Sequence, residues 1–257
     1  MRAAAGNREI SLGWNANSEP DLAGYRVYSS TTGVEPFALQ AAVTTTRYLN
    51  TGLTNGITYF YYVRAYDIGN NESPRSNITN AIPYDITSYT YPITATCSGV
   101  PNCNDALGPP NGTPVDIDGT DVLILDFGPG RGIIDGENPS WDVVFYEWPN
   151  AGGIQMDYTF MDLSVDGVTW YRVFAWDGVP GGVIGTNIDG YATSPPGEEE
   201  NETIPGVDLY PGGLPNNTGV AIDIGPWTPA GYAYRYVRFT YPGGMEAAQI
   251  DSVRRLH

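Results

Sequence analysis

The sequence has 257 residues, among them 32 glycines and 21 prolines, and carries a formal net charge of -17 at pH 7. Dense turn residues disfavour a helix-rich protein, and the acidic balance with scattered arginines argues against binding nucleic acid or an anionic membrane. The chain contains no lysine, and its one histidine is His257. This composition excludes histidine-based triads, histidine metal clusters and lysine phosphate loops, so we expect an all-β protein of two domains without these chemistries.

Residues 1–84 form the first expected domain, because short apolar and polar alternations in them predict antiparallel strands. These strands lie at 9–14, 25–29, 37–43 and 59–65. Trp14 in ISLGW, the segment GYRVY and the segment LTNGITYFYYVRAYD resemble a fibronectin type III domain. The resemblance implies an immunoglobulin-like sandwich with Trp14 in its core and Tyr59 as a tyrosine-corner residue.

Only MRAAAGNRE precedes the ISLGW segment, so we expect the first strand of this sandwich to be short or missing. A missing strand leaves a sheet edge uncovered. Truncation from a longer multidomain protein and donation of a strand by another subunit are both open explanations. We expect the domain to be a spacer, followed by a stiff hinge at the proline of IPYD.

Residues 85–257 form the second expected domain, in which seven apolar runs predict a β-sandwich with Val237, Phe239 and Trp170 buried. The segments ALGPPNG, ILDFG, LSVDGVTWYRV, YRYVRFTY and AQIDSVRRL resemble the galactose-binding-like jelly roll of discoidin-type domains and carbohydrate-binding modules. The Asp-Gly pair in LSVDGVTW predicts a hairpin. The resemblance implies noncatalytic recognition of a sugar by loops at one end of the sandwich, commonly with a structural calcium ion.

Aromatic rings at strand ends are the candidate ligand contacts, because sugar C–H faces stack on rings while hydroxyls bond to neighbouring polar groups. The predicted ligand-binding residues are Tyr146, Trp148, Trp176, Asp177, Tyr191 and Trp227. Each of these rings has the competing interpretation that it caps the core beside a glycine or proline. Trp141 is assigned to neither class.

Calcium is the expected ion, because a chain without internal histidine offers oxygen ligands. One candidate cluster is the turn DGENPSWD with Glu147 as an additional ligand; its ligands are Asp135, Glu137, Asn138 and Asp142. The second cluster would hold the ion where the related jelly rolls do; its ligands are Asn104, Asp105, Asn111 and Glu246. Solvated acidic turns without any ion are the competing interpretation.

Cys97 and Cys103 are five residues apart within a loop, a spacing that favours a disulfide staple over a metal site. A disulfide indicates an oxidising compartment, so we expect an extracellular protein, secreted or at the cell surface. The chain lacks an apolar run of the roughly 18 to 20 residues that a membrane span requires, so membrane insertion is not expected.

These features favour a noncatalytic carbohydrate-binding module on a fibronectin-type spacer, within a multidomain protein. Its expected partner is a glycan or polysaccharide, and neighbouring domains or other copies of the chain are further candidates. A structural or adhesive, filament-forming surface protein is the alternative. A glycoside hydrolase is a second alternative, since paired carboxylates can cleave glycosidic bonds. Because nothing in the sequence selects such a pair, we expect no enzyme activity.

Overall fold

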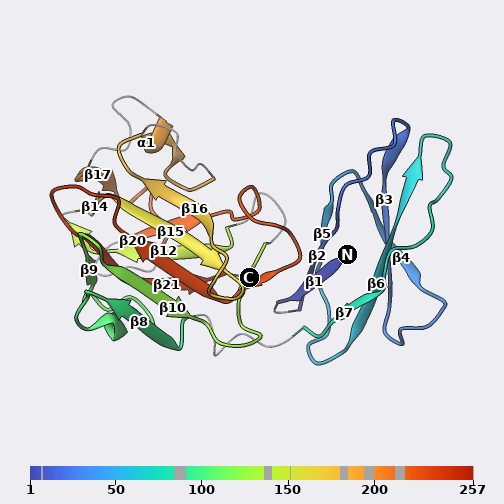
Figure 1. Ribbon diagram of the computed structural model, residues 1–257, viewed down its shortest axis with the longest axis horizontal. Helices are drawn as coiled ribbons and strands as arrows, with labels where there is room; N and C mark the ends of the chain where they lie inside the picture. Colours follow the sequence, from blue (N-terminus) through green and yellow to red (C-terminus); the bar gives the residue numbers. More distant parts are fainter. Residues whose placement is uncertain are drawn as a thin grey trace. The chain divides into compact units, whose positions relative to one another are not determined.

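The computed structural model describes residues 1–6, 8–83, 91–135, 141–150, 152–179, 185–193, 200–211 and 218–256. Within these ranges the chain forms strands β1 to β21, a short 3-10 helix η1 (Cys103–Ala106) and a short α-helix α1 (Asp189–Thr193) (Figure 1). The all-β expectation is therefore confirmed. None of the described helices has the length and apolar character needed to cross a membrane.

The chain divides into two compact units. The first comprises Met1–Ser88 with the segments Ile134–Glu137 and Pro229–Ala233, and the second comprises Tyr89–Ile133, Asn138–Thr228 and Tyr234–His257. The predicted boundary between residues 84 and 85 lies outside the described residues.

The first unit is a β-sandwich of two antiparallel sheets. Its three-stranded sheet has the order β1-β2-β5, with β1 (Arg2–Ala5), β2 (Ile10–Gly13) and β5 (Arg47–Asn50). Its four-stranded sheet has the order β4-β3-β6-β7, with β4 (Ala38–Val43), β3 (Leu22–Ser30), β6 (Tyr59–Asp67) and β7 (Thr79–Ala81).

Alternate residues of these strands build the core of the first unit, as the period-2 pattern predicts. Trp14 packs edge-on against Tyr25 with ring centroids 5.5 Å apart, in a cluster with residues such as Ile10 and Tyr61. The Tyr59 hydroxyl accepts a hydrogen bond from the Thr54 amide at 3.1 Å. This bond to the backbone five residues upstream is the one that the tyrosine-corner resemblance implies.

Strand β1 meets the first of the two expectations for this edge, a short strand and not a missing one. Arg2 to Ala5 pair with Gly13 to Ile10 in an antiparallel ladder, so β1 is short but present and covers the edge of β2. The alanines of this segment give no apolar and polar alternation, and backbone pairing alone defines the strand. Strand β2 is therefore paired on both sides, with β1 and β5, and offers no open edge to a strand from another subunit.

The second unit contains a two-sheet sandwich. The five-stranded sheet has the order β16-β15-β20-β10-β8, with β16 (Tyr171–Trp176), β15 (Thr159–Ser164), β20 (Tyr236–Thr240), β10 (Val122–Asp126) and β8 (Thr94–Ser98). The four-stranded sheet has the order β18-β12-β21-β9, with β18 (Gly219–Ile222), β12 (Val143–Glu147), β21 (Ala248–Arg255) and β9 (Val115–Ile117).

The two sheets of the second unit face each other across an aromatic core. Phe145 of β12 packs against Phe174 of β16 and Phe239 of β20, with centroids 5.1 Å and 5.6 Å apart. Val237 and Phe239 are fully buried, as the sequence predicts. Two smaller sheets complete the strand pairing: one joins β13 (Pro149–Asn150), β14 (Gly153–Met156) and β17 (Glu202–Pro205), and the other joins β11 (Ile133–Ile134) and β19 (Ala233–Tyr234).

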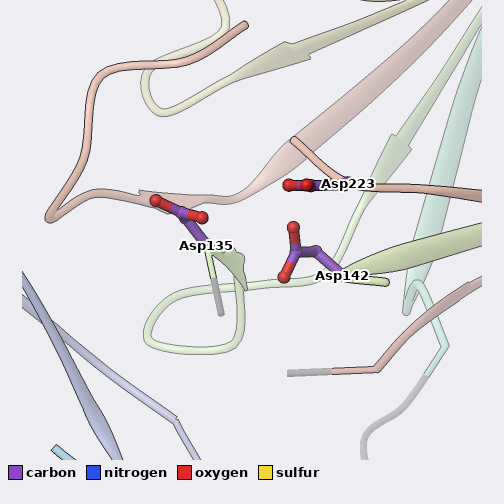
Figure 2. Close-up of side chains that lie close together, drawn as sticks. All are labelled: Asp135, Asp142 and Asp223. Atoms are coloured by element: carbon purple, nitrogen blue, oxygen red, sulfur yellow. The ribbon is translucent and has the colours of Figure 1, made fainter. Parts of the chain in front are cut away.

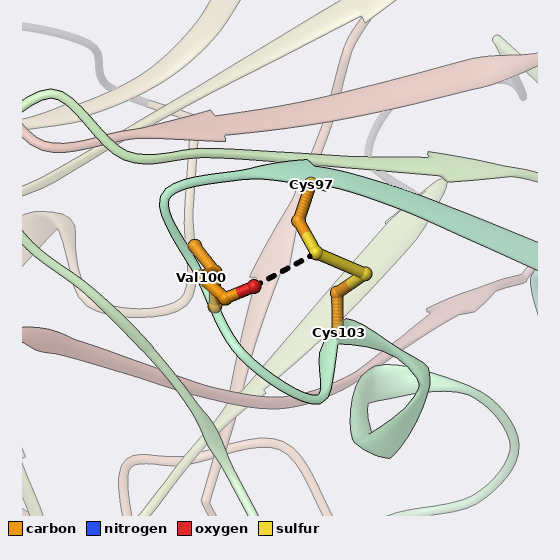
Figure 3. Close-up of a disulfide and its surroundings, with 3 residues drawn as sticks. All are labelled: Cys97, Val100 and Cys103. Atoms are coloured by element: carbon orange, nitrogen blue, oxygen red, sulfur yellow. Dashed lines mark hydrogen bonds between the residues drawn. A yellow bond between two sulfur atoms is a disulfide. The ribbon is translucent and has the colours of Figure 1, made fainter.

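The predicted disulfide is present and ties β8 to η1. Cys97 and Cys103 are bonded with their Cα atoms 6.0 Å apart (Figure 3). The Cys97 Sγ atom also lies 3.1 Å from the Val100 carbonyl oxygen. The bond therefore closes a short loop at an edge strand of the five-stranded sheet, which restricts the unfolded chain.

Candidate functional site

The outer face of the five-stranded sheet, which points away from the core of the second unit, carries polar and aromatic side chains. Met161 of β15 pairs with Phe239 of β20, and both are fully buried. Because side chains alternate between the two faces of a strand, Asp162 and its partner Arg238 lie on the opposite, outer face. A β-bulge brings Arg172 of β16 opposite Asp162 as well.

Asp162 binds two arginines at the centre of this face. Its Oδ1 accepts a hydrogen bond from Arg172 Nε at 2.5 Å, and its Oδ2 accepts bonds from Arg238 Nε and Nη2 at 3.1 Å and 2.9 Å. The carboxylate is 2% exposed, whereas both guanidinium groups reach solvent. The buried acid therefore fixes two planar, partly exposed donors on the sheet.

Each guanidinium group on this face also lies over an aromatic ring. Arg172 lies 3.7 Å from the ring centroid of Phe160, and Arg238 lies 4.2 Å from that of Trp170. The Asp-Gly hairpin predicted from LSVDGVTW joins β15 to β16 and carries Trp170 beside the face; Gly167 at its turn has a φ of 76°. Trp170 is partly exposed here rather than buried.

A third pairing of ring and arginine extends the row along β20. Arg235 lies 4.8 Å from the Tyr236 ring centroid, and its Nε and Nη2 donate to Asp126 of β10 at 2.7 Å each. Hydrogen bonding to Arg235 lowers the pKa of Asp126 despite partial burial. The row therefore combines flat rings, fixed cationic donors and ionised carboxylates, which are the groups that recognise sugar C–H faces and hydroxyls.

Two of the predicted ligand-binding rings are core residues instead. Trp176 is 0% exposed and Tyr146 is 1% exposed, so neither presents a ring face to a ligand. Both are followed by turn-like sequence, but β16 continues to Trp176 and β12 to Glu147, so their rings pack inside the unit. Tyr146 packs with Val144 and Ala221 in a cluster of its own.

The remaining predicted ligand residues lie outside the row of rings. Trp148 follows β12 and is 40% exposed, and Asp177 follows β16 and accepts a hydrogen bond from the Val179 amide. Tyr191 of α1 donates to Asp208 at 2.7 Å, and Trp227 is partly buried. These residues remain predictions as ligand contacts.

Residues of the first predicted metal cluster belong to both units. Asp142 and Asp223 of the second unit have carboxylate oxygens within 4.8 Å of each other (Figure 2). Ile224 N donates to Asp142 and Gly225 N donates to Asp223, at 2.9 Å each. Asp135, also drawn in Figure 2, belongs to the first unit, where Arg47 binds it at 2.6 Å.

Other members of this cluster do not join Asp142. Glu137 and Asn138 lie outside the described residues. Glu147 is five residues further along β12, about 16 Å away at the rise of an extended strand. One ion cannot bind both Asp142 and Glu147, so the sequence interpretation that combined them is wrong.

The second predicted cluster has a different carboxylate at its centre. Asp251 of β21 accepts hydrogen bonds from the amides of Asn111 and Gly112 at 3.2 Å and 3.0 Å. Asp105 lies in the first turn of η1. Glu246 is exposed, and its backbone amide donates a hydrogen bond to the carboxylate of Glu200 at 2.9 Å. The sequence pattern did not reveal Asp251, because it lies in a strand that reads as apolar.

No protein-family model matches the chain. Among curated proteins, it is 34% identical over 84 residues to one from Thermoanaerobacter thermohydrosulfuricus. That protein is an amylopullulanase. The matched part covers 32% of this chain and only 6% of the amylopullulanase.

Solved structures with similarity include two from bacteria. A β-1,2-glucanase from Parabacteroides distasonis is 29% identical, with 34% of this chain and 12% of the glucanase covered and a TM-score of 0.31. An Fn3-like protein from Clostridium thermocellum is 27% identical, with 32% of this chain and 88% of that protein covered and a TM-score of 0.28. Because these TM-scores are low, the fold is assigned from the strand pairing of this chain and not from the similar structures.

Proposed function

We propose that the second unit binds carbohydrate without cleaving it, as an accessory module of a secreted or cell-surface protein. The observation that supports this function is the row of rings on the outer sheet face, in which Asp162 fixes Arg172 and Arg238 beside Phe160 and Trp170. A flat surface of rings and guanidinium donors suits an extended sugar chain, which stacks on the rings and hydrogen-bonds to the arginines.

Three further observations agree with this proposal. The similarity to part of an amylopullulanase supports a place beside carbohydrate-active enzymes. The Cys97–Cys103 disulfide supports an oxidising, extracellular location. The first unit supplies a fibronectin-type sandwich suited to a spacer between functional domains.

Binding to soluble polysaccharides tests the proposal directly. We would measure retardation of the full chain in native gels containing amylopectin, pullulan, β-glucan or xylan, and retention on insoluble chitin and cellulose. Trp170→Ala should weaken binding by roughly tenfold or more, in line with the loss of a buried stacking contact. Trp148→Ala is the matched control, because it removes an exposed ring outside the row.

Two results would overturn the proposal. Failure to bind any of these polysaccharides excludes the assigned ligand class, and loss of binding in Trp148→Ala but not in Trp170→Ala transfers the site to the loop end. Release of new reducing ends by the purified chain, abolished by one carboxylate substitution, would replace a binding module with a glycoside hydrolase.

A further inference from the structure

One end of the sandwich core in the second unit is polar. Phe145 of β12 points into the core, so Glu147, two residues further along the same strand, points inward as well. On the neighbouring strand, Val220 pairs with Phe145, which gives Thr218 the same inward direction. The Glu147 amide donates to the Thr218 carbonyl at 3.2 Å, so these two residues lie side by side.

The opposite sheet contributes two oxygen-bearing side chains at this end. Thr159 opens β15 and alternates with the inward Met161, and Asp157 precedes it by two residues. Phe145 of β12 packs against Phe174 of β16, and Phe174 pairs with Met161 of β15, so these parts of the two sheets face each other. Asp157 and Glu147 are within electrostatic range across this space, since the charge of Asp157 contributes to the raised pKa of Glu147.

These side chains are buried and lack hydrogen-bond partners. Glu147 is 1% exposed and Asp157 is 4% exposed, and both threonines are fully buried. Both carboxylate oxygens of Glu147, Oδ1 of Asp157 and the Oγ1 atoms of Thr159 and Thr218 make no hydrogen bond of normal geometry. The backbone amides of Trp148 and Gln249 lower the pKa of Glu147 by less than burial raises it. None of the ion pairs among the described residues includes either acid.

Such an arrangement is unfavourable unless something neutralises it. A buried ionised carboxylate without a partner costs several kcal/mol, and a second one nearby adds repulsion. Protonation of one carboxyl removes its charge and supplies one O–H donor, which can bond to one of these oxygens but leaves the others without a partner. A bound cation satisfies the carboxylates and hydroxyls together.

We propose that Glu147 and Asp157, with the hydroxyl groups of Thr159 and Thr218, bind a calcium ion that closes this end of the core. Oxygen-only ligands from flexible positions suit Ca²⁺, which takes six to eight of them, whereas Zn²⁺ favours nitrogen and sulfur. Mg²⁺ retains several waters in a strict octahedron, which a buried end of a core accommodates poorly.

Two more carboxylates are within electrostatic range of Asp157. The charges of Glu200 and Glu246 both act on Asp157. Glu200 accepts hydrogen bonds from the amides of Met245 and Glu246, which holds the loop between β20 and β21 close to the site. This negative field attracts a cation, and the ion site does not depend on whether the outer face binds carbohydrate.

Thermal unfolding and calorimetry of the full chain test the ion site. After treatment with a chelator and its removal, CaCl₂ at pH 7.5 should raise the midpoint of unfolding and bind with one equivalent in titration. MgCl₂ at the same concentration should have a much smaller effect. Glu147→Gln should raise the calcium Kd more than about tenfold, since even indirect supporting residues change metal affinity by 10–100-fold.

A matched acid elsewhere serves as the control. Asp223→Asn changes the other close pair of carboxylates in this unit and should leave calcium binding unchanged. Glu147→Gln keeps the shape of the side chain, and a normal unfolding transition without calcium shows that it folds. Absence of calcium binding by the wild-type chain, an unchanged Kd in Glu147→Gln, or loss of binding in Asp223→Asn would each overturn the proposed site.

Discussion

Asp162 and Glu147 are both buried carboxylates of the same sandwich, but their surroundings differ. Asp162, on the outer sheet face, has two arginines bonded to it, whereas Glu147, at the end of the core, has two oxygens without partners. A buried negative charge needs a positive partner, which the chain itself supplies at Asp162. At Glu147 the partner must come from solution, as a proton or a cation. A buried carboxylate therefore fixes the positions of two arginines at Asp162, whereas at Glu147 it makes the end of the core dependent on a bound proton or cation.

The largest expected loss of stability comes from a substitution in the core of the same sandwich. Trp176→Ala should destabilise the chain by about 3–5 kcal/mol, because Trp176 is fully buried and its removal leaves a cavity. Chemical denaturation monitored by circular dichroism measures this loss. A change below about 1 kcal/mol, accompanied by weaker sugar binding, would return Trp176 to the ligand contacts that the sequence suggested.

Removing the carboxylate that has partners should be the next largest effect. Asp162→Ala should lower the free energy of unfolding by about 2–3 kcal/mol, less than for a fully buried pair because Arg172 and Arg238 can turn to water. The same denaturation experiment measures it, with Asp177→Ala as an acid outside the row. Asp162→Ala should also weaken polysaccharide binding, since the arginines lose their fixed positions.

Removing the carboxylate without partners should have the opposite sign. In the presence of a chelator at pH 7.5, Glu147→Gln should stabilise the chain by about 1 kcal/mol, because an amide is cheaper to bury than a charge. With saturating calcium the same substitution should become destabilising. If it destabilises the chain equally under both conditions, Glu147 has partners in the protein and the contrast with Asp162 fails.

The pH dependence of unfolding is the last of these effects. Burial, followed by repulsion from Glu246 and Glu200, raises the pKa of Asp157 from 3.8 to about 7. A raised carboxyl pKa in the folded state favours the protonated form, so the stability it contributes is complete below about pH 4 and is lost as the pH rises through 7. Unfolding midpoints in chelator between pH 4 and pH 8 should therefore fall with pH, and Asp157→Asn should flatten the slope. A stability that rises across this range would contradict the assignment.

The sequence predicted the first unit better than the second. Trp14 and Tyr59 occupy the positions that the fibronectin resemblance implies, because alternation in short antiparallel strands is a local signal. At β1 the sequence left a short strand and a missing strand both open, because the alanines of Arg2–Ala5 show no alternation, and the strand is present. In the second unit, turn residues after Tyr146 and Trp176 suggested exposed strand ends, but the register places both rings in the interior.

Composition by itself decided which chemistries this chain can use. With no lysine and no internal histidine, its polar sites must be built from arginine, carboxylates, hydroxyls and rings, and its alternating runs can only form sheets. Tertiary structure decided which of these groups meet. Asp162 bonds to Arg238 across paired strands, and Asp157 acts electrostatically on Glu147 from ten residues further along the chain. Register assigns each residue to a face, and a shift of one position would reverse every assignment.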